Sequence, residues 1–174
     1  MIPINFTSNE NEKLNFVSPI LVERYNYILD KSEMFDFFFL FKEDNLRIIF
    51  NDQKEVNLQL PMNIKSLTNV FDDFNNLISY DIFDLEFFPF RSLISKGNKK
   101  MSLTEIHNKI LSNLLLYKEG LEKNNLYKII WPKDKDFNEN KLDTHLTNFK
   151  NFIFDNFDTK ANITTIKRRI FIDL

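Results

Sequence analysis

Residues 141–153, KLDTHLTNFKNFI, predict an amphipathic helix in the C-terminal half of this chain. The apolar residues recur at i, i+4, i+7 and i+11, which is one stripe of an α-helix: Leu142, Leu146, Phe149 and Ile153. The opposite face carries hydroxyl and amide groups with lysines at its edges: Thr144, Thr147, Asn148, Asn151, Lys141 and Lys150. Groups of these types bond phosphates and base edges. A plain solvated face is the alternative.

A second segment, ITTIKRRIFI at residues 163–172, is a β-branched run interrupted by Lys167, Arg168 and Arg169. It predicts a basic β-hairpin. A polar helix followed by such a hairpin is typical of a winged-helix domain that binds DNA. The alternative for the three cations is an ordinary charged strand edge, which keeps sheets from aggregating.

The composition sets broad limits. A chain of 174 residues with 43% hydrophobic content forms one or two small domains with a packed core. No 18-residue apolar run and no secretory signal pattern are present in the sequence, so we expect a cytoplasmic protein, located at the bacterial nucleoid if it binds DNA. The absence of Cys removes disulfides, thiolate catalysis and Cys-based zinc sites.

The formal net charge of −2 hides an asymmetry. Residues 96–174 hold 15 Lys+Arg and 10 Asp+Glu, whereas residues 1–95 hold 8 and 15. A basic half attracts polyanions and an acidic half is repelled by them. The split predicts two functional parts, although a solvated surface with uneven charge would give the same counts.

Enzyme chemistry has little support. Gly97 and Gly120 stand alone, which excludes Gly-rich phosphate loops. His107 and His145 are the only histidines, so a transition-metal site would need carboxylates from scattered positions. Asp72-Asp73 are adjacent helical positions that point in different directions, which favours a solvated face. We expect no enzyme activity, no metal and no cofactor.

Short apolar runs separated by polar turns fill residues 14–60 and predict buried strands at 14–17, 35–41, 46–50 and 56–60. A helix is predicted at 20–29, and another opens at Asn63 and continues to Ile78. The order strand–helix–strand–strand–strand–helix predicts a small α/β module over residues 1–78.

From residue 80 the pattern changes, with strands predicted around residues 82–94 and a turn at 96–99. Ser102 and Glu105 form a capping box that would start a helix, which Gly120 stops. A second helix at 124–131 ends at Pro132, with Trp131 expected in the core, and a polar loop at 133–139 follows. Residues 79–174 therefore predict an α+β winged helix-turn-helix domain.

Residues from about 80 to 174 resemble the effector domain of OmpR/PhoB-type response regulators. The family opens with a small antiparallel sheet, has a Leu-Thr-x-x-Glu-like helix start, and closes its second helix with Leu/Val-Trp. Its recognition helix has the pattern Arg-Thr-Val-Asp-Val-His-Ile-x-x-Leu-Arg, and its wing Thr-Val-Arg-Gly-x-Gly-Tyr. The corresponding segments here, in the same order, are FDLEFFPFRSLISKGNKK at 83–100, then residues 101–105, 130–131, 140–150 and 165–171.

The sequence departs from the family where Arg is common, since Asn140, Asn148 and Lys150 stand there. Both wing glycines are replaced, by Arg168 and Ile170. The resemblance implies that the helix at 141–153 enters the major groove of double-stranded DNA. The DNA-binding residues that it implies are Asn140, Lys141, Thr144, His145, Thr147, Asn148, Lys150, Asn151, Thr165, Lys167, Arg168 and Arg169.

The N-terminal part resembles a shortened, degenerate receiver domain. Residues 36–41 look like the central receiver strand, with Phe41 in the place of the phosphoacceptor Asp. Residues 15–18 stand where an acidic pair would follow the first strand, and Leu60 precedes Pro61 where receivers usually have the phosphate-sensing Lys. Without these groups aspartyl phosphorylation has no chemistry to use, so we expect a regulator that it does not control.

The resemblance also implies partners. Family members often bind direct repeats as dimers, so we expect a homodimer formed through the N-terminal module. The loop at 133–140 is the candidate contact for RNA polymerase. The competing class is a protein that keeps the winged helix but acts through protein interaction or nonspecific DNA binding, on RNA polymerase or the nucleoid. The lost Arg residues and wing glycines favour that alternative.

Overall fold

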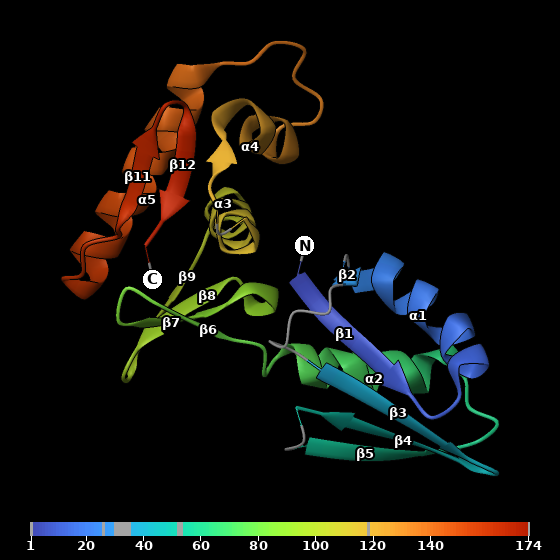
Figure 1. The fold of residues 1–174 in the computed structure, drawn as a ribbon. Helices are drawn as coiled ribbons and strands as arrows, with labels where there is room; N and C mark the ends of the chain where they lie inside the picture. The colour runs from blue at the N-terminus through green and yellow to red at the C-terminus, as the bar shows by residue number, and fades with distance from the viewer. Residues whose placement is uncertain (1, 26, 30–35, 52–53, 118, 174) are drawn as a thin grey trace. The chain divides into compact units, whose positions relative to one another are not determined.

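The computed structural model describes residues 2–25, 27–29, 36–51, 54–117 and 119–173, which form two compact units, Met1–Ile78 and Ser79–Leu174 (Figure 1). The N-terminal unit contains two helices, α1 (Asn11–Tyr25) and α2 (Ile64–Asn75). Its strands are β1 (Ile2–Ser8), β2 (Tyr27–Leu29), β3 (Asp36–Lys42), β4 (Asn45–Phe50) and β5 (Lys54–Gln59).

The five strands form one sheet in the order β2-β1-β3-β4-β5. Strand β1 runs parallel to both β2 and β3, with Phe6 opposite Phe37. Strands β3, β4 and β5 form an antiparallel meander. The unit is thus a mixed α/β structure, in which the parallel pairing is limited to three strands.

The core of this unit is aromatic because burial alternates along β3, where Phe37 and Phe39 are fully buried and Phe38 is half-buried. Helix α2 packs on the buried face, with the Phe71 ring centroid 4.8 Å from that of Phe37. Helix α1 lies on the same face, since its Tyr25 ring stacks on Phe71 at 6.2 Å. Each buried Phe stabilises the fold by about 1.5–3 kcal/mol relative to an exposed one.

Two of the N-terminal predictions are wrong. Residues 14–17, predicted as a strand, belong to α1, and the first strand is β1 instead. The predicted helix at 20–29 ends at Tyr25, and residues 27–29 form β2. The predicted strands at 35–41, 46–50 and 56–60 are confirmed within two residues as β3, β4 and β5, and the following helix is confirmed as α2.

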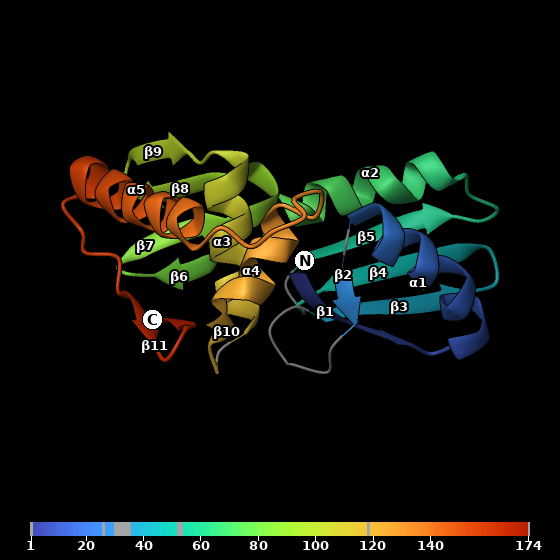
Figure 2. The same cartoon turned by 90° about the horizontal axis from the view of Figure 1, so that it is seen from above.

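The C-terminal unit opens with a four-stranded antiparallel meander, followed by three helices and a small three-stranded sheet in the order β10-β12-β11 (Figures 1 and 2). The meander consists of β6 (Tyr80–Ile82), β7 (Leu85–Phe88), β8 (Leu93–Lys96) and β9 (Lys99–Ser102). The helices are α3 (Glu105–Leu116), α4 (Lys123–Ile130) and α5 (Glu139–Phe157). The small sheet contains β10 (Leu121–Glu122), β11 (Ile163–Ile166) and β12 (Arg169–Ile172). The predicted order of sheet, three helices and terminal hairpin is confirmed.

Several C-terminal boundaries differ from the prediction. The N-cap of α3 is Thr104, whose hydroxyl accepts a hydrogen bond from His107 N at 3.2 Å, and not Ser102, which belongs to β9. Residues 89–91 form a 3-10 turn before β8, where a strand was predicted. Trp131, expected in the core, is half-buried at the end of α4.

The predicted apolar stripe of α5 is confirmed, because Leu142, Phe149 and Ile153 are fully buried and Leu146 nearly so. They pack in the core to which α3 contributes Ile110 and Leu111 and the hairpin contributes Ile170. The helix is longer than predicted, since Asn138 caps its start and Asp158, with φ +51°, ends it. Burial of the stripe leaves the opposite face of α5 in solvent. No helix in the described residues has the length and apolar content needed to span a membrane.

Candidate nucleic-acid interface

The solvent face of α5 carries a continuous set of uncharged polar side chains, which we call the polar stripe: Asn140, Thr144, Thr147, Asn148 and Asn151. All five are exposed, and their spacing places them on one face of the helix. Within the described part of the chain, the side-chain amides of Asn148 and Asn151 make no hydrogen bond to protein. Their donors and acceptors are therefore available to a partner.

Thr144 is the exception in the polar stripe. Its hydroxyl donates a hydrogen bond to the carbonyl oxygen of Asn140 at 2.8 Å, one turn earlier in the same helix. Threonine hydroxyls often bond in this way within helices. Because the hydroxyl hydrogen is engaged, Thr144 keeps its methyl group and the acceptor lone pairs of its oxygen for an outside contact.

Lys141 and His145 line one edge of the polar stripe, where they pack against Trp131. The Lys141 Nζ lies 4.3 Å from a Trp131 ring centroid, and the His145 ring lies 5.3 Å from it. Lys141 also pairs with Asp134 at 2.8 Å, and this hydrogen bond raises the pKa of the lysine. Trp131 thus supports the edge of the candidate interface.

Two carboxylates, Glu139 and Asp143, lie in the first turns of α5, and Lys123 of α4 holds both of them. The Lys123 Nζ is 2.9 Å from Glu139 Oε1 and 2.7 Å from Asp143 Oδ1. Burial alone would lower the pKa of Lys123, which is 8% exposed, but the hydrogen bonds that its ammonium group donates to Asp143 and Glu139 outweigh burial and raise the pKa. Lys123 therefore neutralises negative charge beside the polar stripe. The sequence did not reveal this role, because the three residues come from separate segments.

The hairpin of β11 and β12 turns through Lys167 and Arg168, which have φ values of +48° and +65°. Two successive positive φ values match a two-residue type I′ hairpin turn, here formed without glycine. Thr165, Lys167, Arg168 and Arg169 are all exposed. The hairpin thus presents three cationic side chains to solvent, together with the hydroxyls of Thr164 and Thr165.

The hairpin turn lies beside the start of α5. Arg168 Nη2 is 3.9 Å from Glu139 Oε2, and the Arg168 carbonyl oxygen accepts a hydrogen bond from Lys123 N at 2.9 Å. The ion pair is weak because the Arg168 side chain is 82% exposed. A cavity of about 400 Å³ separates the two elements and is lined by Glu122, Lys123, Asn124, Phe137, Glu139, Lys167 and Arg168. The structure thus brings the start of the predicted helix and the predicted basic turn together.

The charges of this surface lie around the polar stripe. Residues 139–157 are all described, and none of the exposed ones is Lys or Arg, since Lys141 and Lys150 are half-buried at the edges. Exposed cations beside the helix include those of the hairpin, Lys167, Arg168 and Arg169, of which Arg168 pairs weakly with Glu139. The arrangement can offer amide and hydroxyl groups to base edges and cationic groups to phosphates.

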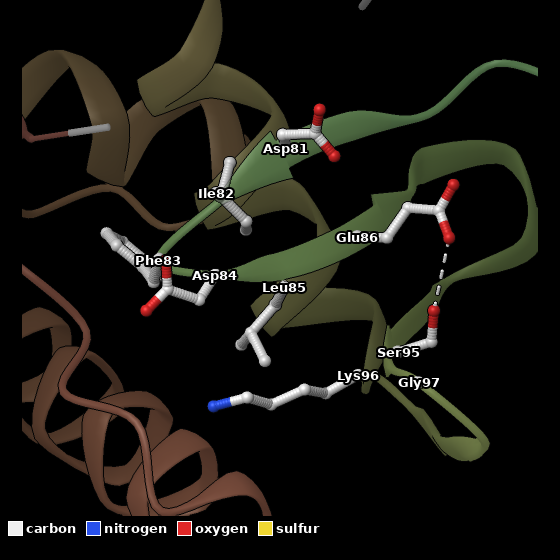
Figure 3. A pocket seen from close by; sticks show the side chains of 9 residues that line it. All are labelled: Asp81, Ile82, Phe83, Asp84, Leu85, Glu86, Ser95, Lys96 and Gly97. Carbon is white, nitrogen blue, oxygen red and sulfur yellow. Dashed lines mark hydrogen bonds between the residues drawn. The ribbon is translucent and has the colours of Figure 1, made fainter.

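A second cavity, of about 520 Å³, lies over the β6–β8 meander (Figure 3). Its carboxylates include Glu86, which accepts a hydrogen bond from the Ser95 hydroxyl at 3.4 Å. Lys96 points away from Glu86 in Figure 3 and donates to the Thr159 hydroxyl at 2.8 Å. Among the described residues, no ion pair joins Lys96 to a carboxylate of this cavity. In the described residues, no group of three or more His, Asp or Glu is placed to hold a metal ion.

In the N-terminal unit, the ends of β1 and β3 lie side by side, and the side chain of Asn9 joins them. Asn9 Nδ2 donates to the Phe41 carbonyl oxygen at 2.9 Å, and Phe41 N donates to Asn9 Oδ1 at 2.8 Å. Phe41 itself is buried. The residues that follow the first strand are therefore Asn9 and Glu10, not residues 15–18 as expected, and Glu10 pairs with Lys13 at 2.8 Å.

No protein-family model and no curated protein matches the chain. Among solved structures, the chain is similar to the DNA-binding domain of Escherichia coli CadC, at 17% identity over 53% of this chain and 89% of that chain, with a TM-score of 0.46. The C-terminal domain of the nisin resistance regulator NsrR, a lantibiotic response regulator, matches 47% of this chain and 84% of its own length at 27% identity, with a TM-score of 0.37. A mutant of RitR matches 99% of this chain and 66% of its own length at 13% identity, with a TM-score of 0.46.

Proposed function

We propose that the chain is a sequence-specific, DNA-binding transcription regulator of the response-regulator type, without enzyme activity. The observation that carries the proposal is the position of the exposed polar stripe of α5 beside the exposed cationic turn of the hairpin. A helix with base-bonding groups and a nearby cationic element supplies both the sequence-specific and the electrostatic part of DNA binding.

In this proposal α5 enters the major groove, with Asn148 and Thr147 nearest the bases. The phosphate contacts come from Lys141, His145, Lys150 and Thr165. Lys167 and Arg168 reach along the backbone or into the minor groove, with Arg169 beside them. Lys141 exchanges Asp134 for a phosphate, and Asn140, Thr144 and Asn151 complete the helix face.

The N-terminal unit acts in this proposal as a degenerate receiver-like module that aspartyl phosphorylation does not control. Phe41 and Asn9 occupy the ends of β3 and β1, where an open α/β sheet with parallel strands usually places its ligand site. We also propose that the unit mediates a homodimer, and that residues 133–140 contact RNA polymerase.

One observation favours a second candidate, a winged-helix protein that acts through protein partners or binds DNA without sequence preference. The polar stripe has no cation, and beyond it the same helix exposes Phe154 (58%), an apolar side chain. An exposed aromatic side chain is a common anchor in protein interfaces.

Selection from a random duplex DNA pool with the full-length protein at near-physiological salt tests the proposed function. Enrichment of a motif, above all a direct repeat with half-sites about one helical turn apart, would support a sequence-specific dimer. Retention of DNA without enrichment would favour a backbone binder. Absence of retention would contradict DNA binding and favour a protein partner.

The role of the hairpin turn is tested by the salt dependence of binding. Each lost phosphate contact should lower the slope of log affinity against log salt by about 0.9. We expect Lys167→Gln and Arg168→Gln to lower the slope, and Lys100→Gln, at an exposed position of β9, to leave it unchanged. Equal slopes in all three variants would remove the hairpin from the interface.

A further inference from the structure

We infer that α5 selects A·T base pairs through their major-groove edges, with Asn148 and Asn151 as the residues that determine this preference. The inference rests on the proposed function and names its substrate class, a DNA target whose contacted base pairs are A·T. It follows from the composition of the polar stripe, which consists of Asn and Thr alone.

The polar stripe lacks the cationic side chains that most often recognise guanine. Arg and Lys make the commonest specific contact, to O6 and N7 of guanine. The nearest cation at one edge, Lys141, lies over the Trp131 ring, and Lys150 is half-buried at the other edge; both contact phosphates in the proposed function. A G·C pair under this face would therefore meet no cationic donor that points at it.

The two amides fit adenine. An Asn side chain pairs with adenine through N6 and N7, donating one hydrogen bond and accepting the other. The amides of Asn148 and Asn151 are exposed and make no hydrogen bond to the described part of the protein, so no internal bond must break first. The two residues are three positions apart, about 4.5 Å along the helix axis. Because both residues lie on the same face of α5, their amides can reach base edges at two positions along one groove.

Thr144 adds an apolar contact for thymine. Its hydroxyl bonds to the Asn140 carbonyl oxygen, so it presents a methyl group to the groove. A threonine methyl is suited to the C5 methyl of thymine. The base-contacting part of α5 ends after Asn151, because the next exposed polar residue on this face, Asp155, carries a negative charge that phosphates repel.

Three pools of random-sequence 24-base-pair duplexes test the inference with the full-length protein: A·T only, G·C only, and inosine·cytosine only. Inosine·cytosine has the major-groove pattern of G·C but lacks the minor-groove amino group of guanine. We expect the A·T pool to bind at least about tenfold more tightly than the other two. Replacing thymine by deoxyuridine in the A·T pool should weaken binding, because the C5 methyl is lost.

Each outcome is decisive. Equal binding of the A·T and G·C pools, or tighter binding of G·C, would overturn the inference and leave DNA binding intact. Inosine·cytosine binding as tight as A·T would also overturn it, because the preference would then arise in the minor groove. Retention of none of the pools would overturn the proposed function and the inference with it.

Two variants separate base recognition from folding. Asn148→Ala should bring the affinity for the A·T pool close to that for the G·C pool, while the affinity for the G·C pool stays constant. Asn69→Ala, at an exposed asparagine of α2, should leave all affinities unchanged. Both substitutions place Ala in an exposed helix, which helices tolerate well. An unchanged A·T preference in Asn148→Ala would remove this residue from base recognition.

Discussion

Gly120 lies against the side chain of Phe171, so the position has no room for a larger residue. It has a φ of +85°, and a Cβ built on it would lie 2.4 Å from Cε1 of Phe171 in β12. Gly97 has a φ of +56° and no atom within 4 Å of such a Cβ. Both glycines therefore have a left-handed backbone, but only at Gly120 would a side chain clash with a neighbour.

We expect Gly120→Ala to lower the free energy of unfolding by about 2–4 kcal/mol, of which about 1 kcal/mol comes from the left-handed backbone and the rest from the clash with Phe171. Gly97→Ala should cost only the backbone part, about 1 kcal/mol. Urea titration of both variants measures the difference. Equal losses would show that the Phe171 ring moves aside freely.

His107 is a buried histidine that faces α5. Its ring centroid lies 5.2 Å from that of Phe149, and its Nδ1 is buried with no hydrogen-bond partner in the described residues. Burial, together with the nearby His145, lowers the pKa of His107 below its usual 6.5. The folded state therefore favours the neutral ring.

Stability should consequently fall as the pH falls. Above about pH 6.5 the ring is neutral in both states, and below this pH the unfolded chain binds a proton that the folded chain resists. The loss grows until the pH reaches the lowered pKa of the folded state. Urea titrations between pH 7.5 and about pH 5 should show a smaller loss in His107→Leu than in the unchanged protein. Parallel profiles would refute the role of His107.

At the scale of elements, Lys123 connects α4, α5 and the hairpin. Its ammonium group holds Glu139 and Asp143, and its backbone N–H bonds to the carbonyl oxygen of Arg168. Lys123→Met keeps the aliphatic stem but leaves the two carboxylates without their cation, beside a surface proposed to meet phosphates. The effect should therefore appear in both stability and DNA affinity.

We expect Lys123→Met to lower the free energy of unfolding by about 1–2 kcal/mol, below the value for a fully buried pair because both carboxylates are partly exposed. DNA affinity should fall as well, and most at low salt, where charge repulsion is least screened. Lys128→Met, at an exposed position of the same helix, is the control. A loss of stability with unchanged affinity would confine Lys123 to a structural role.

The elements also differ in how far the sequence could predict them. Helix α5 was predictable because its four apolar residues fit the helical period and no other. The run at 14–17 fits a strand or a buried helix equally well, and only the burial of Leu14 and Leu21 on one face of α1 decides between them. Ser102 had a capping sequence, yet its pairing with Leu93 keeps it in β9, so Thr104 caps α3 instead.

The candidate site, too, could be predicted from the sequence only in part. The exposed positions of the polar stripe follow from the helical period, so the sequence could predict them. The ion pairs that restrain Lys141 and neutralise Glu139 join residues from separate elements. No local pattern encodes such contacts, since they depend on how α4, α5 and the hairpin pack.

At the scale of the whole molecule, the charge divides with the two compact units. Residues 1–78 hold 7 Lys+Arg and 12 Asp+Glu, whereas residues 79–174 hold 16 and 13. A polyanion such as DNA should therefore be attracted to the C-terminal unit and repelled by the N-terminal unit. The N-terminal unit is then available for a role other than DNA binding. The residues at the ends of β1 and β3 bear on one such role, the acceptance of phosphate.

Phosphoryl donors should leave the protein unchanged, because Asn9 and Phe41, at the ends of β1 and β3, have no carboxylate that could accept phosphate. Phe41 is buried there, and the side-chain amide of Asn9 both donates a hydrogen bond to the Phe41 backbone and accepts one from it. We expect no phosphate adduct by intact mass after incubation of the full-length protein with acetyl phosphate and Mg²⁺, and no change in DNA affinity or elution volume. A competent receiver treated in parallel verifies the donor. A Mg²⁺-dependent adduct accompanied by tighter DNA binding would contradict the proposal, because a carboxylate elsewhere in the chain would then accept phosphate and control the C-terminal unit.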